Sequence, residues 1–113
     1  MKYVMLIMDT PEGREQYRTN EEWFAEVTAW YEKMGASGKL ADGGQQLQGA
    51  GTAKTVRSTG ATDGPFIETK EVLGGYSVLD VATIDEAVEI AKSWPGVDRG
   101  WITIELRPVA EMG

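Results

Sequence analysis

Apolar residues occupy every position from residue 3 to residue 8, in the run YVMLIM. A strand with one solvent-facing side would alternate apolar and polar residues, so a continuous run predicts a strand covered on both faces. Residues 75–82 also place apolar side chains on both faces. We therefore predict two central strands, near 2–8 and 75–82, that lie next to each other in a sheet.

A helix is predicted over residues 20–37, directly after a match to the capping box in which Thr19 precedes Glu22 by three positions. Its apolar residues share one stripe at helical spacing, and they are Trp23, Val27, Trp30, Tyr31 and Met34. A second helix is predicted over residues 84–94, after a second capping box at Thr83 and Glu86. Both helices should therefore begin at well-defined residues and bury one face.

The remaining segments predict shorter strands and loops. Residues 9–18 predict a polar loop, and 61–71 a polar crossing segment. Residues 39–48 and 52–59 predict strands, and 101–108 alternate between apolar and polar side chains as a half-buried strand does. The order of elements predicts an α+β, ferredoxin-like (split βαβ) sandwich with an antiparallel sheet and an extra strand or hairpin.

The face of the sheet away from the helices needs a cover. Two helices pack on one face in this plan, yet both central strands are apolar on both faces. A second copy of the chain, packed sheet to sheet, is the simplest cover, so we predict a homodimer. Trp101, Thr103 and Glu105 are expected on the covered face.

Composition narrows the chemistry. The 113 residues predict one domain, 1–113, and they contain neither cysteine nor histidine, so disulfides, thiolate nucleophiles, Ser-His-Asp triads and Cys- or His-ligated metals are excluded. We predict no metal and no cofactor. The net charge of −7 with scattered Lys and Arg argues against nucleic acid as a partner. The apolar run near the N-terminus is too short for a signal sequence or a membrane span, which predicts a cytoplasmic protein that does not bind membranes.

The densest group of reactive side chains lies in residues 62–71, TDGPFIETKE. Asp63, Glu68 and Lys70 are candidate catalytic groups, because acids beside a lysine can shift one another's pKa values toward acid–base work when partly buried. The candidate ligand-binding residues lie in this segment or on strands near it, and they are Arg57, Asp63, Gly64, Pro65, Phe66, Glu68, Lys70 and Tyr76. The alternative is structural: Asp63 caps a turn, and Glu68 with Lys70 is a solvated pair.

The run 63–71 together with 73–76 closely resembles the signature of the YCII-related, or DGPF-domain, family. The resemblance covers nearly the whole chain, from the opening strand at 2–6 and the glycine-containing segment 40–47 to the last strand at 104–108. It implies a dimeric α+β barrel in a bacterial family whose biochemical activity is generally unassigned. It also implies a possible genomic association with extracytoplasmic-function sigma factors. A His–Asp pair inferred to act in some relatives is absent here, since the chain has no histidine.

Three functions remain open from the sequence. The first is a dimeric small-molecule-binding or regulatory module, with a pocket beside residues 63–71. The second is a cofactor-independent enzyme of monooxygenase, isomerase or decarboxylase type that uses Asp63, Glu68, Lys70 and Tyr76. The third makes the 63–71 motif a dimerisation element alone. A closed, mostly apolar cavity with convergent polar groups would favour ligand chemistry.

Overall fold

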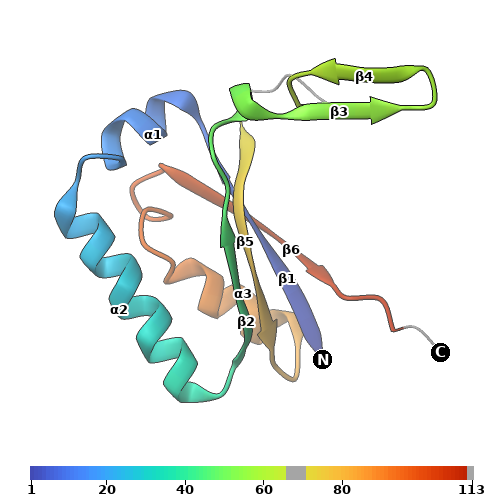
Figure 1. The fold of residues 1–113 in the computed structure, drawn as a ribbon. Helices are drawn as coiled ribbons and strands as arrows, with labels where there is room; N and C mark the ends of the chain where they lie inside the picture. Colours follow the sequence, from blue (N-terminus) through green and yellow to red (C-terminus); the bar gives the residue numbers. More distant parts are fainter. Residues whose placement is uncertain (66–70, 112–113) are drawn as a thin grey trace.

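The computed structural model describes residues 1–65 and 71–111, which form an α+β fold (Figure 1). The strands are β1 (Lys2–Asp9), β2 (Leu40–Gln46), β3 (Lys54–Arg57), β4 (Gly60–Asp63), β5 (Val72–Asp80) and β6 (Ile102–Pro108). The helices are α1 (Pro11–Tyr17), α2 (Glu21–Ser37) and α3 (Ile84–Lys92), with a 3-10 turn η1 at Ala50–Thr52. These elements follow the predicted order, with α1 and the turn added.

β1 and β5 are adjacent at the centre of an antiparallel sheet with the order β2-β5-β1-β6. Met5 pairs with Ser77 across these two strands, and β6 pairs with the other edge of β1. With β3 and β4 set aside as a separate hairpin, this is the strand order of the split βαβ plan. The predicted fold class is therefore confirmed.

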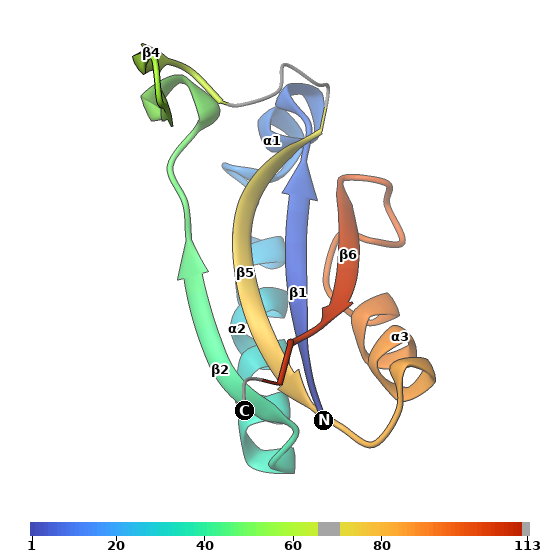
Figure 2. The same ribbon diagram turned by 90° about the vertical axis from the view of Figure 1, so that its right-hand side faces the viewer.

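All three helices lie on one face of the sheet, as Figures 1 and 2 show. Alternate residues of β1 point to that face and are buried, with Met5 completely enclosed. They pack against the predicted stripe of α2, in which Trp23, Trp30 and Met34 are buried and the other two members are half-buried. The hydrophobic core thus lies between the helices and the sheet.

The helix starts differ in how closely they follow the capping signals. Thr83 caps α3, and its hydroxyl accepts a hydrogen bond of 3.2 Å from the backbone N–H of Glu86, as predicted. For α2 the cap is Asn20 instead of Thr19. The Asn20 side chain accepts from the backbone N–H of Trp23 at 3.0 Å, so the predicted box is displaced by one residue.

The prediction of a loop over residues 9–18 is wrong, because α1 occupies most of it. Thr10 caps this helix, since its hydroxyl accepts from the backbone N–H of Gly13 at 2.9 Å, and Pro11 takes the first helical position, where its fixed φ suits a helix. Tyr17 at the far end is buried. A short helix of this kind depends on tertiary packing, which periodicity alone does not reveal.

The opposite face of the sheet carries half-buried apolar side chains, including Val4, Leu6 and Val78. Thr103 and Glu105 lie on this face, as predicted, because they pair with Met8 and Leu6. Trp101 differs from the prediction, since it precedes β6 and packs against the core. No α-helix in the described ranges 1–65 and 71–111 has the length and apolar character needed to cross a bilayer.

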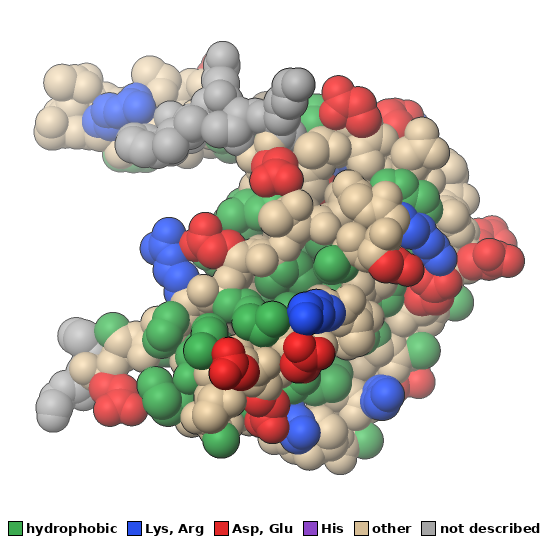
Figure 3. Space-filling view, turned by 180° about the vertical axis from the view of Figure 1, so that it is seen from behind, with side chains coloured by type: hydrophobic (Ala, Val, Ile, Leu, Met, Phe, Trp, Pro, Cys, Tyr) green, Lys and Arg blue, Asp and Glu red, His purple; other side chains and the backbone are tan. Residues whose placement is uncertain are grey.

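β3 and β4 form a hairpin that projects away from the sheet on its open side (Figure 1). The expected extra strand or hairpin is thus a hairpin, and β4 occupies the start of the segment predicted to be a polar crossing. The hairpin and the C-terminal end extend in the same direction and leave a hollow between them (Figure 3). The open face of the sheet therefore lies between two projecting arms.

Candidate functional site

A pocket of about 290 Å³ lies between α2 and the sheet, on the core side. Its walls come mainly from α2, β2 and β5, with further contributions from α1, β1, β6 and the segment after α3. Most of the lining is apolar or backbone, with a few polar side chains, and this is the usual make-up of a ligand pocket. The polar side chains form two groups, one around Asp9 and one around Tyr31 and Ser77.

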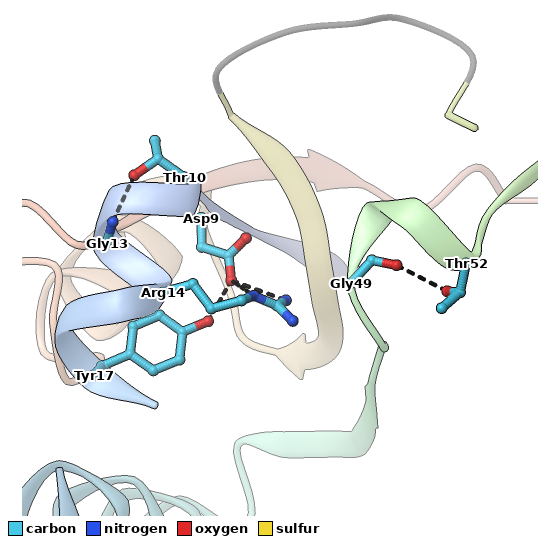
Figure 4. A network of polar contacts seen from close by, with 7 residues as sticks. All are labelled: Asp9, Thr10, Gly13, Arg14, Tyr17, Gly49 and Thr52. Carbon is cyan, nitrogen blue, oxygen red and sulfur yellow. Dashed lines mark hydrogen bonds and ion pairs between the residues drawn. The ribbon is translucent and has the colours of Figure 1, made fainter. Parts of the chain in front are cut away.

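Asp9 forms the centre of one polar group (Figure 4). It is 3% exposed, and its Oδ2 accepts hydrogen bonds from the Tyr17 hydroxyl and from Arg14 Nε at 3.1 Å, while Arg14 Nη2 also lies 3.1 Å away. Asp9 Oδ1 is buried and has no hydrogen-bond partner among the described residues. Asp9 and Tyr17 both line the pocket, and Oδ1 points away from the Tyr17 hydroxyl and from Arg14 (Figure 4).

Local structure brings these three residues together. Asp9 ends β1, where it pairs with Ile102 and Val72 on the neighbouring strands. Arg14 and Tyr17 are three positions apart on α1 and therefore share one face of that helix. Because α1 starts immediately after β1, its first turns fold back over the carboxylate.

Burial raises the pKa of the Tyr17 phenol well above its ordinary value near 10, and the hydrogen bond to Asp9 raises it further. The Tyr17 hydroxyl consequently keeps its proton at neutral pH and donates it to Asp9. Tyr17 can therefore position the carboxylate but is a poor proton acceptor. The acceptor in this cluster is Asp9.

A second polar chain runs along the side of the pocket formed by α2 and β5. Ser77 Oγ donates its one proton to the carbonyl of Gly43 at 2.8 Å, so the Tyr31 hydroxyl, 2.7 Å from Ser77 Oγ, must be the donor in that contact. Tyr31 in turn accepts from Trp94 Nε1 at 3.3 Å. The proton of each hydroxyl in this chain is already engaged within the protein.

Four glycines line the pocket in two pairs, Gly43 with Gly44 and Gly74 with Gly75. Gly44 has φ +73°, and a Cβ there would lie 1.7 Å from the carbonyl oxygen of Tyr76, so this position accepts only glycine. A Cβ at Gly74 would lie 3.2 Å from Asp9 Oδ2. The glycines of β2 and β5 thus provide bare backbone next to the carboxylate.

Aromatic side chains form the other wall. Trp23 stacks at a tilt on Tyr17, with ring centroids 4.2 Å apart, and meets Phe24 and Trp94 edge to face. The Trp23 indole N–H donates to the carbonyl of Pro95 at 3.0 Å. Phe24 is 41% exposed, so the aromatic wall extends to the surface of the molecule.

The residues predicted from the 63–71 motif lie elsewhere or are not described. Asp63 is exposed on the β3–β4 hairpin and forms an ion pair with Lys54, and Arg57 is on the same hairpin. The carbonyl of Gly64 accepts from Thr55 Oγ1 at 2.8 Å, and Pro65 is exposed. These residues are absent from the pocket lining.

Phe66, Glu68 and Lys70 fall outside the described residues, so a site that includes them stays a prediction. Tyr76 does line the pocket. It pairs with Leu6, and strand alternation directs its side chain to the open face, so its backbone faces the pocket. Of the described residues predicted for the site, Tyr76 therefore lines the pocket. It does so together with residues such as Asp9 and Tyr17, which the sequence analysis did not select.

Asp9, Arg14 and Tyr17 were missed because residues 9–18 were interpreted as a loop. Two signals were available. An acid directly follows a strand that is covered on both faces, and Thr10 with Pro11 is a helix start. In the described part of the chain, no group of three or more Asp or Glu side chains is arranged to hold a metal ion.

Comparisons with known proteins agree with this architecture. A family model described as YCII-related domain matches residues 1–112. The uncharacterized protein R00369 of Rhizobium meliloti (strain 1021) is 32% identical over 94 residues, which cover 80% of this chain and 76% of that protein.

A solved structure that resembles this fold is 5-chloro-2-hydroxyhydroquinone dehydrochlorinase (TftG) from Burkholderia phenoliruptrix AC1100, in complex with 2,5-dihydroxybenzoquinone. It matches with a TM-score of 0.62 and 18% identity, over 99% of this chain and 96% of that chain. TftG has the dimeric α+β barrel fold, and the likeness shows the fold alone. The family model covers almost the whole chain, so this protein belongs to the YCII-related domain family.

Proposed function

We propose that this protein binds a small organic molecule in the pocket between α2 and the sheet, with Asp9 as its polar anchor. The observation that carries the proposal is the largely apolar pocket of about 290 Å³, whose lining includes the buried carboxylate of Asp9. One oxygen of this carboxylate, Oδ1, has no hydrogen-bond partner in the described residues, and a buried acceptor left unpaired costs about 1–3 kcal/mol. Unsatisfied buried groups of this kind are often found at functional sites.

TftG gives this proposal limited support. That protein shares the fold and was solved with a small ring compound bound. A chain of the same plan can therefore hold a ligand of this size. The identity between the two sequences is 18%, so the residues that would bind the ligand here are argued from this structure alone.

A cofactor-independent acid–base enzyme is the second candidate, and among the described residues the burial of Asp9 favours it over the exposed Asp63 as the acid–base group. Arg14 and Tyr17 hold one carboxylate oxygen of Asp9, and the other forms no hydrogen bond within the described residues. Asp63, in contrast, is exposed and paired with Lys54. Binding in the pocket is the step that both candidates share.

A homodimer through the open face of the sheet is part of the same proposal. This face presents Val4, Leu6 and Val78 in a half-buried state, between the hairpin and the C-terminal end (Figures 2 and 3). Covering these side chains with the same face of a second copy removes apolar area from water on both partners. The pocket lies on the opposite side of the sheet, so each copy would keep its own site.

Native mass spectrometry of the purified protein tests the binding site. We expect a bound small molecule in the wild-type protein and its loss from Asp9→Asn, because the amide carries no charge and offers a weaker acceptor. Val27→Trp should also lose the bound molecule, because Val27 lines the pocket on α2 and the larger ring of Trp would fill that space. Circular dichroism spectra would confirm that both variants remain folded.

Asp63→Asn is the matched control, because it makes the same chemical change on the exposed hairpin. It should retain the bound molecule. Retention in Asp9→Asn together with loss in Asp63→Asn would instead place the site at the 63–71 motif. A wild-type protein that carries no bound mass, and binds no fragment in a ligand-observed NMR screen, would contradict the proposal.

A further inference from the structure

The β3–β4 hairpin is an arm that its own chain leaves largely uncovered. Among the described residues it forms a separate two-stranded sheet, and two strands without further packing are marginally stable in water. Val56 on this arm is 78% exposed, more than any other large apolar side chain in the described ranges. The radius of gyration is 15.2 Å, whereas a compact domain of this length has about 13 Å, so the arm extends beyond the compact body.

We propose that the hairpin of one copy contacts the C-terminal segment of a second copy, residues 108–111, and that Val56 packs against the partner's Val109. This inference rests on the homodimer of the proposed function, because it assumes that the two open faces pack together. It adds a contact outside the two sheets, and it fixes the direction of the two-fold axis.

The hairpin is long enough to reach a second copy. Each of its strands has four residues, which extend about 13 Å at about 3.3 Å per residue. Two sheets packed face to face lie about 10 Å apart. An arm that projects from the open side of one sheet therefore reaches the level of the other sheet, and Val56 is the third of the four residues of β3.

The hairpin and the C-terminal segment lie at opposite ends of the sheet. The hairpin follows β2 and precedes β5, at the end where Val72 pairs with Asp9. The C-terminal segment leaves the other end, where the backbone N–H of Val109 donates to the carbonyl of Lys2 at 2.9 Å. Figure 2 looks onto the open face, with the hairpin at the upper end near β2 and the C-terminal segment crossing the lower end from β6 toward β5.

Two-fold symmetry decides which segments meet. An axis that runs across the strands, between the two sheets, exchanges the upper and lower ends of the face and keeps the β2 edge on the same side. It therefore places each hairpin next to the C-terminal segment of the other copy. An axis along the strands would instead place each hairpin next to the start of β6 in the other copy, near Thr103.

Side-chain chemistry favours the axis across the strands. Val109 is 43% exposed, so in this arrangement exposed valines from the two copies remove each other from water. At the start of β6 the open face presents the polar Thr103, whose hydroxyl already donates to Glu71 at 2.8 Å, and this neighbour would leave Val56 uncovered. Residues 53–63 also carry a net charge of +1 in a chain of net charge −7, which favours a second copy of this acidic chain as the partner.

Cross-linking between single-cysteine variants tests the contact, because the chain has no cysteine of its own. Val56→Cys is mixed with Val109→Cys, the subunits are allowed to exchange, and a short bismaleimide joins thiols that lie close together. We expect a covalent dimer on a denaturing gel from this mixture. A mixture of Val56→Cys with Thr103→Cys should give less than a tenth as much, because the axis across the strands keeps these two positions apart.

A charge on the arm gives a second measurement. Val56→Asp should raise the dissociation constant of the dimer at least tenfold in sedimentation equilibrium, and its exposed position means that the monomer should remain folded. Thr62→Asp is the matched control, because it adds the same charge on the opposite face of the hairpin, where Thr62 pairs with Thr55. Equal effects of the two variants would overturn the packing of Val56.

The outcomes separate this inference from the homodimer on which it rests. A covalent dimer from the Thr103→Cys mixture instead of the Val109→Cys mixture would show an axis along the strands and overturn the contact. A wild-type dimer in light scattering with no cross-link in either mixture would also overturn it, while the homodimer stands. If the wild-type protein is a monomer at micromolar concentration, the homodimer and the contact both fail.

Discussion

At the scale of single residues, Asp9 stands out because it is an acidic side chain buried inside the protein. Its carboxylate is buried at the end of a central strand, where an unpaired charge would be strongly destabilising. Arg14 supplies the opposite charge, and Tyr17 supplies a neutral donor to the same oxygen. The cluster therefore stabilises a buried acid while it leaves one oxygen uncommitted.

Tyr17→Phe is expected to lower the free energy of unfolding by about 1.5–3 kcal/mol at pH 8, the range for a hydrogen bond to a charged group. The pKa of Tyr17 is raised on folding, so the folded state holds this proton more tightly than the unfolded chain. The stabilisation from Tyr17 is thus complete below pH 10 and is lost as pH rises above that value. Urea unfolding of both proteins at several pH values measures the difference.

The wild-type advantage over Tyr17→Phe should shrink steadily as the pH is raised above 10. Tyr3→Phe is the control, since the hydroxyl of Tyr3 contacts only the sulfur of Met1 among the described residues. At pH 8 it should cost less than Tyr17→Phe, because its hydrogen bond is to a neutral sulfur and not to a carboxylate. If the difference in free energy of unfolding between the wild-type protein and Tyr17→Phe stays constant above pH 10, the hydrogen bond to Asp9 does not raise the pKa of Tyr17.

At the scale of elements, β2 is shaped by its glycines. The ladder between β2 and β5 shifts register twice, between Leu40 and Asp42 and between Asp42 and Gln45. Gly44 lies in the second shift, with a positive φ and with its Cα against the β5 backbone. The Ser77 hydroxyl holds the neighbouring Gly43 carbonyl at 2.8 Å, so the irregular strand is fixed from the core side. This irregularity exposes peptide backbone to the pocket.

Gly44→Ala is expected to destabilise the fold by more than about 2 kcal/mol, because a strained φ alone costs about 1–3 kcal/mol and the methyl group also meets the Tyr76 carbonyl. Gly43→Ala is the matched control next to it. A Cβ at Gly43 meets no atom within 4 Å and its φ is not positive, so the cost should stay below about 1 kcal/mol. Thermal unfolding followed by circular dichroism compares them, and equal costs would refute the explanation.

At the scale of the whole molecule, the two faces of the sheet differ in what covers them. One face packs against the helices and borders the pocket, and the other presents apolar side chains between two projecting arms. A second copy on the open face would also cover the contact in which the Thr103 hydroxyl donates to Glu71 at 2.8 Å. We expect the dimer to bury at least about 1,200 Å² in total, as stable interfaces do.

Val78→Arg tests this arrangement, because it introduces a charge among the apolar side chains of the open face. Light scattering coupled to size-exclusion chromatography should give a dimer for the wild-type protein at micromolar concentration and a monomer for Val78→Arg. Val88→Arg makes the same change on an exposed position of α3, on the other side of the sheet, and should stay dimeric. A wild-type monomer under these conditions would contradict the dimer.

Local signals were most reliable where burial and periodicity agreed. The unbroken apolar run at 3–8, the stripe on α2 and the Thr83 cap each correspond to an observed element or contact. The cap at Thr19 failed because Asn20, the next residue, offers equally good capping chemistry. The loop at 9–18 failed because the helix start at Thr10 and Pro11 was not weighed against the polar composition of the segment.

The candidate site was the hardest feature to predict, because it depends on residues that are distant in sequence. The cluster of charges at 63–71 is conspicuous in the sequence, yet Asp63 lies on an exposed hairpin. The pocket described above is assembled from α2, the glycines of β2 and β5, the end of β1 and Tyr17 of α1, and a site that includes residues 66–70 stays a prediction. Single polar residues such as Asp9 carry no distinguishing pattern until folding buries them.

The amino-acid sequence by itself determined the family, the order of the elements and the pairing of the two central strands, because hydrophobic periodicity and the motif are local properties of the chain. Only the tertiary structure decided which acid is buried, which tyrosine hydroxyl binds it, and where bare backbone meets an aromatic wall. The physical reason is that burial and hydrogen bonding are set by the packing of distant segments. Asp9 and Gly74 are 65 positions apart in the chain, and folding brings them into contact.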